Sequence, residues 1–290
     1  MRDETDTDLQ YLRTWIGRTE TVQDEVRAAP VAALAATLDR PIPSLQTGDP
    51  LPLLWHWLFC LPLHRASELA ADGHAHLGGF LPPVPLPRRM YAGGSVEVRQ
   101  VLRIGDVVSR VSRIADVSHK AGRTGVLVFV TIQHDFSVGG DLAVAERQDL
   151  VYRDAPGPDD PAAPPRMAQD EAAWTREIRP DEVLLFRYSA LTFNGHRIHY
   201  NRTFALDQGY PGLVVHGPLL ATLLADIVRR HIPDARVSRF SFRAVRALFD
   251  GAPFLVCGLP SQDGRTVKLW AQEPNGALAM EAAATLKIAD

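Results

Sequence analysis

The order of helical and strand-like segments along the chain is the feature that most constrains its fold. In the first half, two helical segments, 26–38 and 51–61, precede a run of strands. The strand-like segments are rich in β-branched residues, partly alternate between apolar and polar side chains, and end at glycine-containing turns. They span 95–104, 107–120, 125–136 and 141–153. Helices followed by a run of strands are typical of an α+β fold with an antiparallel sheet.

The second half of the chain repeats this order. A short helical segment, 187–193, is followed by a stronger one, 217–231, whose leucines, isoleucine and valine recur with helical spacing. Four strand-like segments come next, at 237–248, 253–261, 266–274 and 277–289. We therefore expect two copies of a helix wrapped by an antiparallel sheet.

A proline-rich segment separates the two halves. Residues 154–168 contain five prolines and almost no large apolar side chain, so they cannot form an interior helix or strand. We expect an extended linker there, between an N-terminal domain of residues 1–153 and a C-terminal domain of residues 169–290.

Composition excludes several classes of protein. The chain has 31 Lys and Arg against 34 Asp and Glu, a net charge of −3, which argues against a dedicated nucleic-acid binder. Its two cysteines can form neither a disulfide framework nor a thiolate zinc site. The most apolar run, 51–63, contains two prolines and is shorter than the about 20 residues that a membrane-spanning helix needs. Because the N-terminus also lacks the apolar core of a signal peptide, we expect a cytoplasmic protein that does not enter membranes.

Titratable and polar residues concentrate in one segment, 188–202. His199 is the best candidate acid or base, because an imidazole exchanges protons near neutral pH. The amide of Asn194, five residues earlier, can orient a water molecule. Spacing alone leaves open that His199 only bonds a backbone carbonyl and structures the loop.

The sequence His216-Gly217-Pro218 stands at the start of the strong helix, 217–231. A proline is well placed in the first turn, and the free N–H groups of a helix N-terminus stabilise negative charge. The Gly217 N–H could hold a thioester oxygen that becomes negative during reaction. The alternative is that Gly217 only permits helix–sheet packing.

These motifs resemble those of the MaoC-like, (R)-specific enoyl-CoA hydratases, which have the hotdog fold. In that family a Tyr-x-x-x-x-Gly-Asp-x-Asn-Pro-x-His signature precedes a His-Gly-x-Leu helix start. Here Tyr188 opens the signature, His199 matches the catalytic histidine, and His216 to Leu219 match the helix start. The phrases FNGHRIHY and RRMYAGG are similar to those of a double-hotdog subfamily. It includes mitochondrial-type 3-hydroxyacyl-thioester dehydratases and hydratases of mesaconyl-CoA, methylfumaryl-CoA and itaconyl-CoA.

The resemblance implies an α+β double hotdog that adds water reversibly across the double bond of a 2-enoyl-CoA. It implies His199, Asn194 and Gly217 as catalytic residues and no metal or redox cofactor, because coenzyme A is part of the substrate. One departure is that Asn194 occupies the position of the family's aspartate. Asparagine cannot accept a proton, so proton transfer would fall to His199, and Asn194 would only position water or substrate.

Several other residues are candidates for substrate binding. The adjacent Arg88 and Arg89 could bind the free carboxylate of a dicarboxylic acyl-CoA, or the coenzyme A phosphates, because arginine forms bidentate bonds with both. Arg197 could contact phosphate or adenine. A solvated turn is the alternative for Arg88 and Arg89, and a surface carboxylate for Arg197. The remaining candidates are His196, Tyr200 and His216.

Other features point away from further chemistry. We expect no metal at His196-x-x-His199, since no third ligand is evident nearby. The histidines of the segment ADGHAHLGG could approach a ligand, but a solvated loop is the favoured interpretation. The first half has no counterpart of Asn194 and His199, so we expect it to shape the acyl pocket without catalysing.

Two alternatives to a hydratase remain open. One is a hotdog acyl-CoA thioesterase, for which Asp226 is the candidate acid, although it lies about two helical turns past Gly217. The other is a non-catalytic acyl-thioester binding protein. In each case an acyl thioester is the expected ligand, and a monomer or a homodimer of such chains is the expected assembly.

Overall fold

A computed structural model of the chain describes residues 4–41, 44–122, 125–155, 164–169 and 171–287. Its α-helices are α1 (Glu4–Arg13), α2 (Ala28–Thr37), α3 (Glu182–Leu191), α4 (Arg202–Asp207) and α5 (Gly217–His231). Short 3₁₀ helices are η1 (Trp55–Leu58), η2 (Ala66–Glu68) and η3 (Arg197–His199). The strands are β1 (Thr19–Glu25), β2 (Arg88–Val98), β3 (Val107–Gly122), β4 (Gly125–Val138), β5 (Asp141–Arg153), β6 (Trp174–Ile178), β7 (Arg236–Ala244), β8 (Phe254–Pro260), β9 (Thr266–Gln272) and β10 (Leu278–Lys287).

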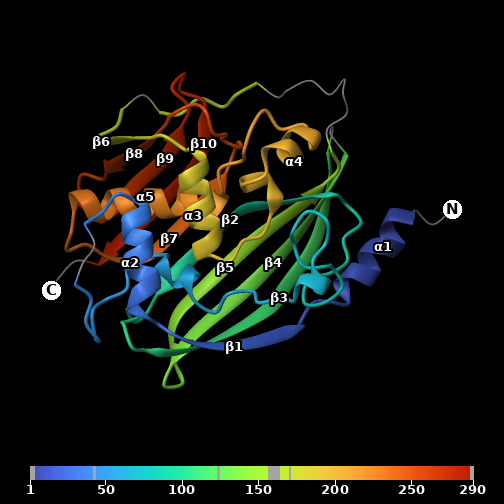
Figure 1. Cartoon of the computed structure of the whole chain (residues 1–290), viewed down its shortest axis with the longest axis horizontal. Helices are drawn as coiled ribbons and strands as arrows, with labels where there is room; N and C mark the ends of the chain where they lie inside the picture. The colour runs from blue at the N-terminus through green and yellow to red at the C-terminus, as the bar shows by residue number, and fades with distance from the viewer. Residues whose placement is uncertain (1–3, 42–43, 123–124, 156–163, 170, 288–290) are drawn as a thin grey trace.

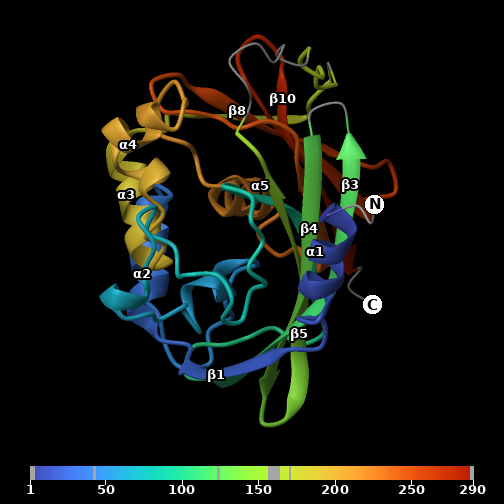
Figure 2. The ribbon, with the colours of Figure 1, turned by 90° about the vertical axis from the view of Figure 1, so that its right-hand side faces the viewer.

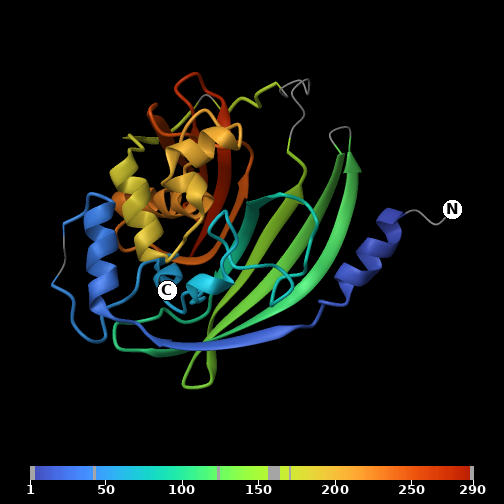
Figure 3. The same ribbon diagram turned by 45° about the vertical axis from the view of Figure 1, so that its right-hand side comes forward.

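The strands of both halves form one antiparallel sheet (Figure 1). Their order is β1-β3-β4-β5-β2-β7-β10-β9-β8-β6. The halves join where β2 pairs with β7, from Gly93 opposite Arg243 to Glu97 opposite Arg239. The expected α+β architecture is confirmed, and the two expected sheets are continuous through this pair. Figure 3 shows the long, curved strands of the first half beside the strands of the second.

The junction between the halves depends on two glycines. A side chain at Gly93 would overlap the carbonyl oxygen of Phe242, and one at Gly94 would overlap the carbonyl oxygen of Arg147. The neighbouring strands therefore approach β2 more closely than any other residue type allows.

Helix α5 is the central helix of the second half. It packs on strands β2, β6, β8, β9 and β10, and every residue from Leu219 to Val228 is buried. Its bounds match the expected helix 217–231, because the apolar stripe and the proline in the first turn both mark it.

The first half is built differently. Its helix α2 packs mainly against α3 and η1, not across the strands as α5 does. In Figure 2, α2, α3 and α4 lie opposite the sheet formed by β3, β4 and β5, and chain segments without regular structure lie between them.

The expected helix at 51–61 is wrong. Only η1 is helical there, and Leu54 and Cys60 have positive φ angles of 66° and 53°. Prolines 52 and 62 bound the segment, and long-range contacts determine its path: the Trp57 indole N–H donates to Glu146, 3.0 Å away. The segment is nevertheless buried, as its composition predicts.

Other boundaries shift for local reasons. The helix expected at 187–193 begins at Glu182, because the Asp181 side chain accepts a hydrogen bond from the Leu184 N–H and caps it. Strand β2 lies earlier than the expected strand 95–104, and the mostly polar strands β1 and β6 at the sheet edges were not predicted.

Three further expectations concern the chain as a whole. The proposed linker, 154–168, lies largely outside the described residues, so the division into domains stays a prediction. None of the helices in the described ranges combines the length and apolar character needed to cross a bilayer. Both cysteines are buried free thiols.

Candidate active site

A cavity of about 1480 Å³ lies between the two halves, at the N-terminus of α5. The predicted site residues that line it are Arg89, Asn194, His196, His199, Tyr200 and Gly217. Its walls otherwise come largely from strands β2 to β5 and from the segment between η1 and β2. Because α2 packs against α3 and η1, it does not cover this part of the first sheet, and the cavity extends along it.

The loop after α3 presents the polar residues. Phe193 adopts a left-handed backbone conformation with φ 51°, and the Asn194 N–H donates to the Ser189 carbonyl at 2.8 Å. The Asn194 side-chain oxygen accepts from the His196 N–H at 3.0 Å. The amide oxygen of Asn194 is therefore used to shape the loop, and its NH₂ group is left to donate toward the cavity.

His199 is held in one tautomer. Its Nδ1–H donates to the Val214 carbonyl oxygen at 2.7 Å, so Nε2 carries the lone pair. The side chain is 7% exposed and lines the cavity. Burial lowers the pKa of His199 to about 4, which keeps the ring neutral and able to accept a proton at neutral pH.

His216 supports His199 and does not reach the cavity. Its ring stacks on that of His199 with 3.7 Å between centroids, and its Nε2 lies 2.8 Å from the Ser189 hydroxyl. His216 is fully buried and is not among the residues that line the cavity. The expectation that His216 binds substrate is wrong. Its buried ring, at the start of α5, contacts His199 and Ser189 and does not line the cavity.

Two of the predicted cations are also engaged elsewhere. Arg88 donates to the Gln208 carbonyl at 2.5 Å and stacks on Tyr210. Arg197 donates to the Ala71 carbonyl at 3.1 Å and stacks on Phe204. Neither lines the cavity, so a role for Arg88 or Arg197 in binding coenzyme A stays a prediction. Among the described residues, Arg197 donates to a backbone carbonyl and not to a surface carboxylate.

Arg89 and Tyr200 do line the cavity. The charge of Arg89 contributes to lowering the pKa of nearby His74, after the larger effect of burial. The Tyr200 hydroxyl donates to the Gly195 carbonyl at 2.9 Å, and the residue is 43% exposed. Arg89 is thus the arginine of the predicted set that lines the cavity.

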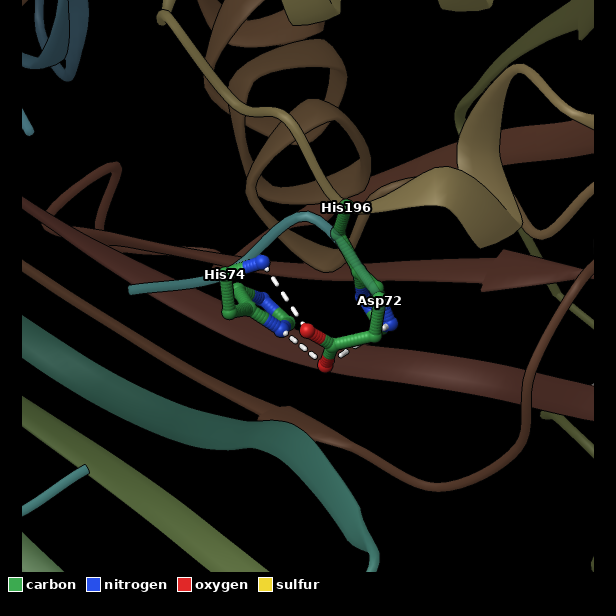
Figure 4. Close-up of side chains that lie close together, drawn as sticks. All are labelled: Asp72, His74 and His196. Carbon is green, nitrogen blue, oxygen red and sulfur yellow. Dashed lines mark hydrogen bonds and ion pairs between the residues drawn. The ribbon is translucent and has the colours of Figure 1, made fainter. Parts of the chain in front are cut away.

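The first half adds two residues that were not predicted, Asp72 and His74. The His74 Nδ1 lies 2.8 Å from the Asp72 carboxylate, and the His74 backbone N–H donates to the same carboxylate at 3.0 Å. His196 Nε2 lies 3.9 Å from it (Figure 4). The candidate ligand atoms of these three residues lie within 4.8 Å of one another, close enough to hold a metal ion.

Hydrogen bonds and burial set the charge in this cluster. Burial opposes ionisation of Asp72, but hydrogen bonds from the His74 side chain and backbone outweigh it and hold the carboxyl pKa well below its usual value. Burial lowers the pKa of both His74 and His196. The cluster is therefore an ionised carboxylate beside two neutral imidazoles.

In the sequence, Asp72 and His74 are marked only by the histidine-containing segment ADGHAHLGG. This segment does not form the expected solvated loop. Gly73 has φ +90°, and a side chain there would overlap the carbonyl oxygen of Gly195. The Arg197 N–H donates to the Asp72 carbonyl at 2.9 Å. Two loops more than 100 residues apart in the chain are thereby joined backbone to backbone.

Asp226, the candidate acid of the thioesterase alternative, lies away from this site. It is buried in α5 and does not line the cavity. Its carboxylate contacts three arginines, Arg40, Arg176 at 3.3 Å and Arg230 at 2.6 Å. Asp226 is therefore part of an ion-pair cluster, so it does not support a thioesterase.

Comparison with known proteins defines the family. The family model for hydroxyacyl-thioester dehydratase type 2 matches residues 54–250, more than half of the sequence, and the chain belongs to this family. The resemblance seen in the motifs is thus confirmed.

Individual relatives agree with this assignment. The chain is 45% identical over 273 residues to the mesaconyl-C(4)-CoA hydratase of Chloroflexus aurantiacus, which covers 94% of this chain and 96% of that protein. It is 27% identical to the mitochondrial hydroxyacyl-thioester dehydratase type 2 of Schizosaccharomyces pombe, covering 81% and 88% of the two chains. A solved MaoC-like dehydratase shares the fold, with a TM-score of 0.72 at 16% identity over 97% of this chain and all of that one.

Proposed function

We propose that this protein is a hydratase that adds water reversibly across the double bond of a 2-enoyl-CoA. The observation that carries this function is the free Nε2 lone pair of the buried His199, which lines the cavity at the N-terminus of α5. Membership of the hydroxyacyl-thioester dehydratase family supports the same reaction.

The geometry suggests how the reaction proceeds. His199 Nε2 accepts an O–H of the bound water and acts as a general base as the water oxygen bonds to Cβ. The electrons of the double bond move toward the thioester oxygen, which becomes negative. The Gly217 N–H, in the first turn of α5, stabilises that oxygen. Transfer of the proton to Cα completes hydration, and the reverse sequence is dehydration.

The substrate we propose is a short dicarboxylic enoyl-CoA of the mesaconyl-CoA or itaconyl-CoA type. The 45% identity to a mesaconyl-C(4)-CoA hydratase over nearly the whole chain favours this class. Arg89 in the cavity wall is the residue we propose for the free carboxylate. We further propose that the protein works in the cytoplasm, needs no metal or redox cofactor, and acts as a monomer or a homodimer.

The first test follows the loss of enoyl-thioester absorbance with crotonyl-CoA, mesaconyl-C(4)-CoA and itaconyl-CoA. We expect turnover of a dicarboxylic member and its loss in His199→Ala. If the folded wild type consumes none of the three, the hydratase function is wrong. Release of free thiol would identify a thioesterase, and binding without turnover would identify an acyl-thioester binding protein.

The role of Arg89 is tested with the same panel. We expect Arg89→Ala to raise KM for the dicarboxylic substrate at least tenfold while leaving crotonyl-CoA nearly unaffected, because only the former carries a free carboxylate (about tenfold is 1.4 kcal/mol). Equal losses on both substrates would contradict this role.

A further inference from the structure

We propose that the first half of the chain supplies a second proton-transfer group to the reaction centre, namely His74 oriented by Asp72. This inference rests on the proposed hydratase function and deepens it. It also replaces the expectation that the first half only shapes the acyl pocket.

The first observation is how His74 is held. Asp72 accepts from both the ring and the backbone N–H of His74, at 2.8 and 3.0 Å, which fixes the ring (Figure 4). Because the carboxylate can only accept, the shared proton belongs to His74 Nδ1, and the lone pair lies on Nε2. The His74 side chain is 22% exposed and lines the cavity, so this lone pair is available to a ligand.

The second observation is where His74 stands. Its ring centroid is 4.0 Å from that of His196, which is in turn 5.5 Å from that of His199. The contact of Gly73 with Gly195 holds the two loops in this arrangement. Residues from both halves thus place two neutral imidazoles, His74 and His199, in the lining of one cavity, with the His196 ring near both.

The third observation is that the two imidazoles have different partners. His199 donates to a neutral backbone carbonyl, whereas His74 donates to a carboxylate. A proton taken up by His74 is therefore balanced by the charge of Asp72, as in the histidine–aspartate pair of a catalytic triad. The nearby groups that affect it are Arg89, which opposes protonation, and His196. Asn194 cannot accept a proton at all.

The step can be written with both imidazoles flanking one water. Each Nε2 accepts one O–H of the water. As the oxygen bonds to Cβ, one O–H bond breaks and its proton passes to His199 Nε2, while the double-bond electrons move to the thioester oxygen. His199 then returns this proton to the oxygen, now on Cβ, as the other O–H bond of that oxygen breaks and its proton passes to His74 Nε2. His74 transfers the proton it has gained to Cα as the enolate collapses, which leaves a hydroxyl on Cβ and two neutral imidazoles.

The arrangement favours this role over a metal site, although the same three residues could bind a cation. The 2.8 Å separation between His74 Nδ1 and the Asp72 carboxylate is that of a hydrogen bond, with a proton between them. The test therefore also measures activity after treatment with a chelator and after addition of Zn²⁺.

The test measures hydration of mesaconyl-C(4)-CoA by the full chain. We expect His74→Ala to lower kcat by about 100-fold or more, the usual contribution of a proton-transfer group, with KM changed less than threefold. Added imidazole should restore part of this activity. Asp72→Asn, which keeps the side-chain size, should lower kcat by about tenfold or more and move the acidic limb of the kcat/KM profile to lower pH, because the imidazolium loses its counter-charge. Asp72→Glu should recover part of the loss.

The controls separate the possible failures. His119→Ala removes an exposed histidine of β3 and should leave kcat unchanged. If His74→Ala keeps kcat within threefold while His199→Ala is inactive, His74 is not a proton-transfer group. The proposed hydratase function then still stands. A wild type that hydrates no enoyl-CoA overturns both. If a chelator abolishes wild-type activity and Zn²⁺ restores it, the cluster is a metal site and the dyad is overturned.

Discussion

At the scale of single residues, one hydrogen bond decides what His199 can do. The Val214 carbonyl takes the proton of Nδ1 and leaves Nε2 free, while burial keeps the ring neutral. The residue thus satisfies both alternatives that the sequence left open, since it bonds a backbone carbonyl and also presents a base.

The pH dependence of activity follows from this environment. The working form of the base is neutral, and burial lowers the pKa of His199 to about 4. Activity should therefore persist well below the usual histidine pKa of about 6.5 and fall only as the pH approaches 4. A kcat/KM profile with a stable substrate checks this. An acidic limb near 6.5 would contradict it.

Gly73 offers a sharp test of the contact between the two loops. Gly73→Ala forces a side chain into a backbone with φ +90° and against the Gly195 carbonyl. We expect a loss of at least about 2 kcal/mol in unfolding free energy and a large drop in kcat. Gly17→Ala is the matched control, because Gly17 has φ +89° with nothing within 4 Å of the added side chain. Equal effects of the two variants would show that the contact is unimportant.

The site was predictable from sequence only where its residues are close together along the chain. Asn194, His199 and Gly217 belong to one motif segment, and the structure places all three at the cavity. Asp72 and His74 were not assigned to the site, since the residues that bring them there, His196 and Arg197, lie more than 100 residues away and no local spacing records that contact. The contact of Arg88 with the distant Gln208 carbonyl was likewise not predictable from local spacing.

At the scale of elements, α5 was the most predictable part of the fold, and the segment 51–61 the least. A continuous apolar stripe and a proline in the first turn specify α5 almost without tertiary information. Segment 51–61 is equally apolar. Its composition predicts that it is buried but does not predict its backbone conformation. Its path depends on contacts such as that between Trp57 and Glu146.

Helix α5 also ties the halves together through Asp226. Arg40 follows α2, Arg176 lies in β6 and Arg230 in α5, and all three meet this one buried carboxylate. We expect Asp226→Asn to destabilise the protein by about 3 kcal/mol, because three arginines lose their shared counter-charge. We expect kcat to stay within about threefold, as Asp226 does not line the cavity.

Thermal unfolding of Asp226→Asn and its hydration rate, measured together, check this prediction. A stable variant without activity would instead place Asp226 in the catalytic machinery and revive the thioesterase alternative.

At the scale of the whole molecule, the repeated order of segments suggested two domains, but the sheet and the core are continuous. Residues of α2, such as Leu34, share one buried cluster with Leu219 of α5, Val96 of β2 and Phe240 of β7. We therefore expect a single cooperative unfolding transition in calorimetry, with equal calorimetric and van't Hoff enthalpies. Two separated transitions would contradict this and support two independent domains.

The contact between Gly73 and Gly195 has a consequence for how such chains can be recombined. The two loops touch through backbone atoms, so a compensating side chain cannot repair a mismatch between them. A chimera that joins the first half of one relative to the second half of another should work only if both parents keep glycine at these two positions. The permitted exchanges between relatives would then be set by a pair of residues that carry no side chain.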